Sequence, residues 1–75
     1  MLAIFSATMA EIEPGKSYKL TKPTFLYQGV LINQNSVVDV KSIDEDGTCT
    51  ILYLDRENLP HDIPGIRVDD LSALN

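Results

Sequence analysis

Two apolar segments rich in β-branched residues, 37–43 and 48–54, flank an acidic tetrapeptide, DEDG, at 44–47. Alternating or continuous runs of such residues are typical of β-strands. Asp-Gly between two runs favours a hairpin, because glycine tolerates a positive φ and aspartate hydrogen-bonds to nearby backbone. The sequence therefore predicts an antiparallel hairpin over residues 37–54, and this hairpin constrains the fold more than any other feature of the chain.

The two strands of this hairpin differ in their patterns. In the first, Val38 and Val40 are expected to face inward, and Ile43 breaks the alternation by one residue, which indicates a bulge or a strong twist. In the second, both faces are fairly apolar, which is typical of a strand at the centre of a sheet. One face carries Cys49, Ile51 and Tyr53, and the other carries Thr50, Leu52 and Leu54.

The segment before the hairpin predicts a shorter strand. Residues 17–21 alternate, with Tyr18 and Leu20 on the expected inner face. Pro23 ends this strand, because proline has no N–H to donate to a sheet ladder. The following apolar stretch contains Gly29, where we expect a bulge.

Turn-forming residues divide the rest of the chain. Residues 33–36 predict a turn, and residues 55–65 predict a loop because they contain two prolines and a glycine. A short strand is expected at 66–68. Asp69 and Asp70 then open a single helical or 3-10 turn that is expected to bury Leu71 and Leu74.

These elements predict an all-β fold, because no helical pattern in the 75 residues reaches three turns. We expect a small barrel of about five short strands with a terminal 3-10 turn, since closure shields strand edges. Residues 13–75 are expected to form this single domain, and residues 1–12 to precede it as an extension. The opening MLAIFSATMA leaves three alternatives: a flexible extension, an edge strand, or a leader before a start at Met9.

The net charge of −5 disfavours general nucleic-acid binding, because a phosphate backbone repels an acidic domain. The six basic residues are unevenly spread, however, and Lys16, Lys19 and Lys22 lie close together. With Tyr18 and Tyr27 they form the candidate contact surface of an alternative function, a nucleic-acid-binding small barrel.

The chain offers little that would support catalysis or cofactor binding. Cys49 and His61 are the only thiol and imidazole, and neither has an evident orienting partner. A structural zinc site needs about four ligands, usually cysteine and histidine, and the chain has only these two. In a calcium loop with Gly47 at its sharp turn, Tyr53 would occupy the place of the final bidentate glutamate. We therefore expect no enzymatic activity, no metal and no cofactor.

Cysteine content and hydropathy bear on location. A single cysteine excludes an internal disulfide, and small secreted domains usually carry several, so the sequence predicts a reducing cytoplasm. No apolar run approaches the roughly 20 residues that span a bilayer, so no membrane span is expected.

The segments EPGKSYKL, VKSID, TCTILY and IRVDDLSAL, spread over residues 13–74, resemble in type and spacing the SH3-like small barrels, including their Tudor and KOW-type members. Accessory subunits of photosynthetic and electron-transfer complexes, and some phage and plasmid proteins, look similar. The resemblance implies a barrel in which a closing strand runs into a short 3-10 turn. KOW-type relatives bind RNA through basic loops, and this acidic chain departs from that pattern.

The Tudor resemblance also implies an aromatic cage for methylated side chains. Tyr53 and Asn58 have the spacing of a cage tyrosine and its asparagine. Arg56 stands where a second aromatic is expected, so Phe25 or Tyr27 would have to serve. A cage with one or two aromatic walls holds a cation weakly, and a core or rim position for Tyr53 is the simpler interpretation.

The remaining candidate for function is the surface around residues 55–67. Loops on a rigid frame are where small domains usually meet partners. Leu59 and Ile63 are apolar within this polar stretch, and they either fold back on the barrel or form a contact patch. The candidate partner-binding residues are Tyr53, Asp55, Arg56, Glu57, Asn58, Leu59, His61, Ile63 and Arg67.

These observations predict a non-catalytic protein-interaction module or accessory subunit. Nine of the eleven acidic residues lie between Asp39 and Asp70, and they could steer a basic protein partner. Besides nucleic-acid binding, a second alternative is a small acidic regulator or inhibitor from a mobile element that acts on a host protein. The sequence leaves the oligomeric state open.

Overall fold

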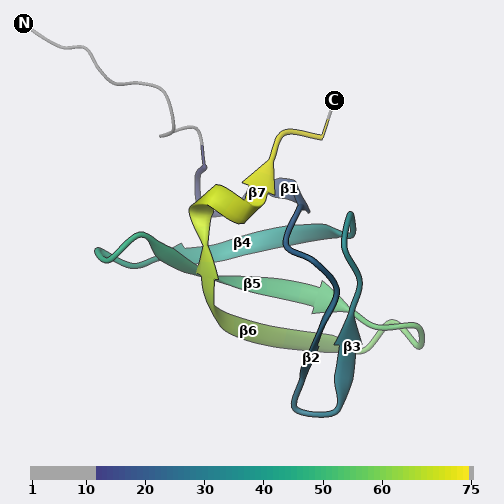
Figure 1. Ribbon diagram of the computed structural model, residues 1–75. Coiled ribbons are helices and arrows are strands. Elements are labelled where there is room, and N and C mark those ends of the chain that lie inside the picture. Colours follow the sequence, from purple (N-terminus) through teal and green to yellow (C-terminus); the bar gives the residue numbers. More distant parts are fainter. Residues whose placement is uncertain (1–11, 75) are drawn as a thin grey trace, which may run out of the picture.

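A computed structural model of the chain describes residues 12–74, which form seven β-strands and one 3-10 turn and contain no α-helix (Figure 1). The elements are β1 (Ser17–Leu20), β2 (Phe25–Tyr27), β3 (Val30–Ile32), β4 (Val37–Ile43), β5 (Thr48–Leu54), β6 (Pro60–Arg67), the 3-10 turn η2 (Val68–Asp70) and β7 (Leu71–Ser72). The predicted all-β class is therefore confirmed, although the strands outnumber the five expected.

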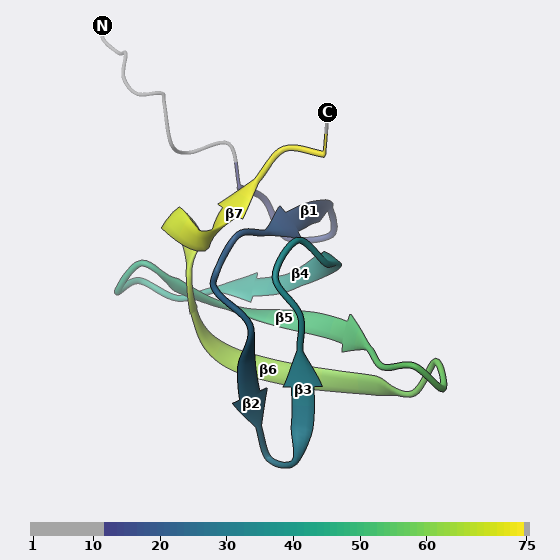
Figure 2. The same ribbon diagram turned by 45° about the vertical axis from the view of Figure 1, so that its right-hand side comes forward.

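Five of the strands form one antiparallel sheet in the order β6-β5-β4-β1-β7. The other two, β2 and β3, form a separate hairpin that crosses in front of the sheet (Figures 1 and 2). Because β6 and β7 remain the two edges of the sheet, the strands do not close into the expected barrel. The structure is instead a curved open sheet with a hairpin over one face.

The hairpin predicted over residues 37–54 is confirmed as β4 and β5. Gly47 has a φ of +89°, and the Thr48 N–H donates to Asp46 Oδ1 at 3.1 Å. The hydrogen bonds from Thr48 also lower the pKa of Asp46. The predicted irregularity is present as well, because the register shifts between Val40 and Ser42.

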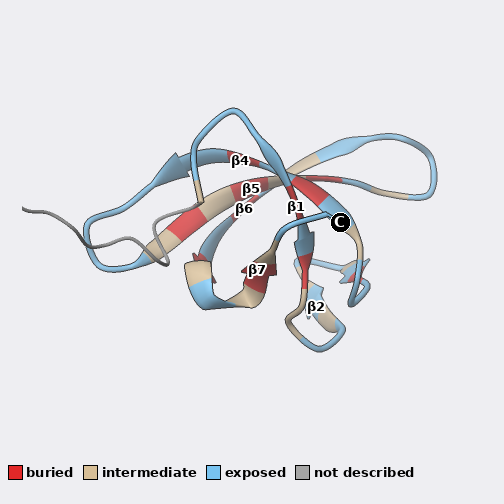
Figure 3. Cartoon of the chain, turned by 90° about the horizontal axis from the view of Figure 1, so that it is seen from above, coloured by how far each residue is buried: buried red, intermediate tan, exposed pale blue. Residues whose placement is uncertain are grey.

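The core lies on one face of the sheet, under the β2–β3 hairpin. Figure 3 shows buried segments recurring along the strands, whereas the hairpin tips are exposed. As predicted, β5 is flanked by two strands and buries the face with Cys49, Ile51 and Tyr53. The buried side chains are Tyr18, Leu20, Ile32, Val38, Val40, Cys49, Ile51, Tyr53, Ile63, Ile66 and Leu71.

The loop predicted at 55–65 is wrong beyond residue 59, because β6 begins at Pro60. Pro60 is the first residue of the strand, and Pro64 lies where the β5–β6 register shifts, next to Gly65 at φ +75°. An edge strand tolerates proline at its first residue and at a bulge, since the missing N–H leaves no partner unpaired. The strand expected at 66–68 is therefore only the end of a longer one.

Of three smaller expectations, the turn at 33–36 is confirmed, whereas those for Gly29 and Leu74 are wrong. Gly29 is not a bulge residue: with Gln28 it forms the two-residue turn of the β2–β3 hairpin, both at positive φ (49° and 84°), as a type I′ turn requires. The turn at 33–36 is confirmed by the bond from the Ser36 N–H to the Asn33 carbonyl at 3.3 Å. Leu74 was expected to be buried but is 53% exposed.

The N-terminal extension is described only from Ile12, which packs half-buried against the core and so belongs with the folded part. Residues 1–11 lie outside the described residues, and the three alternatives for MLAIFSATMA with them. No helix within residues 12–74 is long and apolar enough to cross a membrane.

Candidate functional site

An open groove lies between β3 and the β5–β6 turn. Its volume is about 890 Å³, within the range of ligand-binding clefts. The β3 side is contributed by Gly29, Val30, Leu31 and Asn33, and the β5–β6 side by Tyr53, Asp55, Arg56 and Glu57. The groove thus joins two segments that are distant in the chain.

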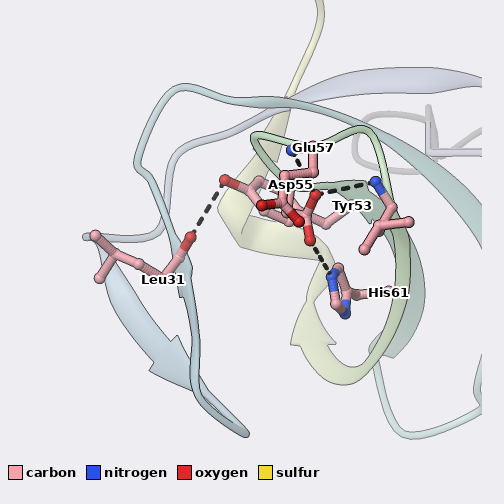
Figure 4. Close-up of polar contacts among 6 residues, drawn as sticks. Leu31, Tyr53, Asp55, Glu57 and His61 are labelled. Carbon is pink, nitrogen blue, oxygen red and sulfur yellow. Dashed lines mark hydrogen bonds and ion pairs between the residues drawn. The ribbon is translucent and has the colours of Figure 1, made fainter.

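Tyr53 connects the two sides of the groove. Its side chain is 7% exposed, and its hydroxyl donates to the Leu31 carbonyl at 3.3 Å (Figure 4). This bond ties β5 to the β2–β3 hairpin. Because most of its ring is covered by the core, Tyr53 does not present the open face that an aromatic cage would need, and Phe25 and Tyr27 also pack half-buried against the core.

Asp55 organises the β5–β6 turn. Its Oδ1 accepts hydrogen bonds from the N–H groups of Glu57 at 2.8 Å and Leu59 at 2.9 Å. Its Oδ2 lies 2.8 Å from Nε2 of His61, as Figure 4 shows. The bond with His61, followed by the backbone bonds, lowers the pKa of Asp55. Both carboxylate oxygens are therefore occupied by contacts within the chain. We call this set of contacts to Glu57, Leu59 and His61 the Asp55 clamp, because it fixes the shape of the turn.

The backbone of the turn is closed by two further bonds. The Asn58 N–H donates to the Asp55 carbonyl at 2.9 Å, and the Asp55 N–H donates to the Leu59 carbonyl at 3.1 Å. Asn58 has a φ of 64°, a conformation that asparagine adopts more readily than most residues. Asn58 is thus a turn residue by its backbone.

Arg56 and Glu57 occupy the centre of this fixed turn and line the groove. Both are exposed, and within the described part of the chain neither side chain makes an ion pair or a hydrogen bond. A guanidinium and a carboxylate therefore extend from neighbouring positions of a hydrogen-bonded turn at the groove, and neither has a partner within residues 12–74.

The other candidate partner-binding residues separate into surface and core. Leu59 is 52% exposed beside the turn, whereas Ile63 is 1% exposed in the core, so only Leu59 can contribute to a contact patch. Arg67 lies at the far end of β6 and contacts Asp69 at 3.6 Å, away from the groove. Ile63 is therefore too buried to contact a partner, and Arg67 lies on the surface outside the groove.

The four β3-side residues were missed by sequence reasoning. Gly29 between two short apolar runs is a turn signal, but Gln28 is not one of the residues that usually precede glycine in a two-residue hairpin turn. No sequence signal places the β2–β3 hairpin against the β5–β6 turn, because that contact depends on a side chain from β5 reaching the backbone of β3.

The candidates for nucleic-acid contact do not form one surface for stacking and phosphate binding. Tyr18 is 7% exposed and accepts a hydrogen bond from the Glu13 N–H at 2.9 Å. Lys16 pairs with Glu13 at 3.2 Å, and the Lys22 ammonium lies 5.1 Å from the centre of the Phe25 ring. Lys19 is exposed on β1, and Tyr27 is half-buried on β2.

Cys49 and His61 do not meet. Cys49 is fully buried, and burial, with a smaller effect from the charge of Asp44, raises the pKa of its thiol. Opposite His61 in the sheet is Tyr53, four residues along β5 from Cys49, a separation of about 13 Å. The structure does supply His61 with the orienting partner that the sequence did not reveal, Asp55.

No group of three or more histidine, cysteine or acidic side chains within residues 12–74 is placed to hold a metal ion. In comparisons with known proteins, no protein-family model, no curated protein and no solved structure matches the chain.

Proposed function

We propose that the chain is an SH3-like, non-catalytic interaction module that binds a protein partner in the groove between β3 and the β5–β6 turn, as an accessory subunit of a larger complex. Two features of the chain order support the SH3-like assignment. The VKSID segment ends β4 and leads into the turn before β5, and β6 runs directly into η2 before the last strand pairs with β1.

One observation carries the proposal: hydrogen bonds fix both sides of the groove, while two charged side chains in its lining make no hydrogen bond or ion pair within residues 12–74. The Tyr53–Leu31 bond and the Asp55 clamp fix both sides of the groove. Arg56 and Glu57 then line the groove without partners among residues 12–74, and the exposed side chain of Leu31 lines it with them. Interfaces typically combine such an apolar contact with polar groups whose geometry is preset.

We also propose a cytoplasmic location for the module. The only cysteine is a buried free thiol, so the fold makes no use of a disulfide. Small domains of oxidising compartments usually depend on disulfides for stability.

Affinity capture from the source cell, quantified by mass spectrometry, tests the function. The groove variant is R56E/E57R, which exchanges the two charges, keeps the net charge and leaves Asp55 intact. The matched control is R67D/D69R, which exchanges an exposed pair away from the groove. We expect a partner to be retained by wild type and control and lost from the groove variant. Absence of any partner on the wild type, or equal retention by all three forms, contradicts the proposal.

A further inference from the structure

The free edge of β3 faces the groove. β3 pairs only with β2, so its other edge is bonded to no strand among residues 12–74. Leu31 lies opposite Leu26 in this pair, and its carbonyl points away from β2, because it accepts the Tyr53 hydroxyl. In an antiparallel ladder the N–H and C=O of one residue point to the same side. The Leu31 N–H therefore also points into the groove.

The turn geometry leads to the same conclusion. Tyr27 and Val30 flank a two-residue turn and form the hydrogen-bonded pair of the hairpin. The next pair, Leu26 with Leu31, is then a non-hydrogen-bonded pair whose backbone groups point outward on both edges. Because Tyr53 takes the Leu31 carbonyl, the Leu31 N–H is the group left on this edge for a ligand.

We propose that the groove takes an extended peptide segment of the partner, which adds as a third strand along β3 and carries a lysine or arginine next to Glu57. This inference rests on the proposed function and specifies its ligand. The added strand accepts a hydrogen bond from the Leu31 N–H, and its apolar side chains contact Leu31. Strand addition of this kind draws affinity from main-chain bonds and specificity from side chains.

The preference for a basic side chain follows from the charges at the groove. Asp55 is saturated by two backbone N–H groups and His61, so Glu57 is the carboxylate of the turn that can meet a ligand. The chain as a whole carries −5, and a negative field favours the approach of cationic segments. Arg56, on the same turn, is placed to bind a carbonyl or carboxylate of the peptide.

A random heptapeptide library displayed on phage, panned on the purified full chain, supplies the probe. We expect the selected peptides to be enriched in lysine or arginine. In the labelled wild-type chain at saturation, their binding should shift the amide resonances of Gly29, Leu31 and Asn33 and slow hydrogen exchange at the Leu31 N–H. This last measurement needs no variant, and unchanged exchange at Leu31 would overturn strand addition.

Leu31→Pro removes the outward donor without removing a β2–β3 ladder bond. Its matched control is Leu26→Pro, which removes the equivalent donor on the opposite edge of the hairpin, at a side chain that is also exposed. Leu31→Ala keeps the donor and removes most of the side chain. We expect L31P to weaken binding about two- to tenfold beyond L31A, the range of one hydrogen bond, and L26P to leave binding unchanged.

Glu57→Gln tests the charge, with Glu45→Gln at the exposed tip of the β4–β5 hairpin as its control. We expect E57Q to weaken binding of basic peptides by up to about fivefold, as for one exposed ion pair, and E45Q to have no effect. Peptides that shift the groove amides equally well in L31P and wild type would refute strand addition while leaving the proposed function intact. If no peptide is enriched, or if shifts fall outside the groove, the inference is wrong and the groove also loses its support as the binding site.

Discussion

Asp55 and His61 lie on opposite sides of the β5–β6 turn, and Oδ2 of Asp55 is 2.8 Å from Nε2 of His61. The same carboxylate holds two N–H groups of the turn through its other oxygen. One side chain thus fixes both the backbone of the turn and the first residues of β6. The positions of Arg56 and Glu57 at the groove depend on this arrangement.

Stability should fall in acid because of Asp55 and Asp46. The pKa of each is lowered in the folded state from its ordinary value of 3.8 by hydrogen bonds, from Thr48 at Asp46 and from His61 and backbone N–H groups at Asp55. Between the folded and unfolded pKa values the unfolded chain binds more protons, so stability rises with pH there. Both contributions are complete above about pH 5 and are lost as the pH falls through 4 and below. Urea unfolding midpoints from pH 7 to pH 3 should show this decline.

The double variant D46N/D55N tests the assignment of this pH dependence. Asparagine keeps an acceptor oxygen for the backbone bonds but does not titrate, so we expect a flatter decline in acid. E45Q/E57Q removes the same charge from the same two turns and should retain the decline of the wild type. A wild-type slope in D46N/D55N would show that other groups are responsible.

Tyr53→Phe should weaken the attachment of the β2–β3 hairpin. The change removes the hydroxyl that donates to the Leu31 carbonyl and leaves the buried ring in place. We expect a loss of about 0.5–1.5 kcal/mol in the free energy of unfolding, measured by urea denaturation. Tyr27→Phe is the control, because the half-buried Tyr27 makes no hydrogen bond through its hydroxyl within the described chain, and should change stability by less. Equal losses would mean that the Tyr53 hydroxyl does not hold the hairpin.

Truncation to alanine should lower the free energy of unfolding much more at Ile63 than at Leu59. Ile63→Ala removes a side chain that is 1% exposed, and the lost burial and the cavity should cost about 2–5 kcal/mol in unfolding free energy. Ile63→Val, at about 0.5–1.5 kcal/mol, serves if the alanine variant does not fold. Leu59→Ala removes a side chain that is 52% exposed and should stay within about 0.5 kcal/mol. Comparable effects at both positions would contradict their assignment to core and surface.

Gly47→Ala should destabilise the β4–β5 hairpin through the backbone alone. Gly47 has a φ of +89°, and a Cβ there would meet no atom within 4 Å. The cost is therefore the left-handed conformation itself, about 1–2 kcal/mol by thermal or urea unfolding. Gly47→Asn should cost less, because asparagine tolerates positive φ better than alanine. If asparagine and alanine are equally costly, backbone strain is not the reason.

How far the sequence alone predicts this fold is best seen at particular elements. The β4–β5 hairpin, its bulge and the buried face of β5 follow from local pattern, since alternation and Asp-Gly turn chemistry act between neighbours in the chain. Pro60 and Pro64 misled the prediction of β6. Their effect depends on whether a strand is central or at an edge, which is a property of the whole sheet.

The candidate site divides in the same way. The sequence alone determined that residues 55–58 are polar and lie outside regular strands, because short polar side chains satisfy turn backbone locally. Only the tertiary structure decided that the Tyr53 hydroxyl bonds to the Leu31 carbonyl and that the Asp55 carboxylate contacts His61. It also decided that the free edge of β3 lies across the groove from Arg56 and Glu57. These relationships join segments through the curvature of the sheet and the placement of a hairpin over it. They are set by the packing of a shared core, which no local pattern in the chain encodes.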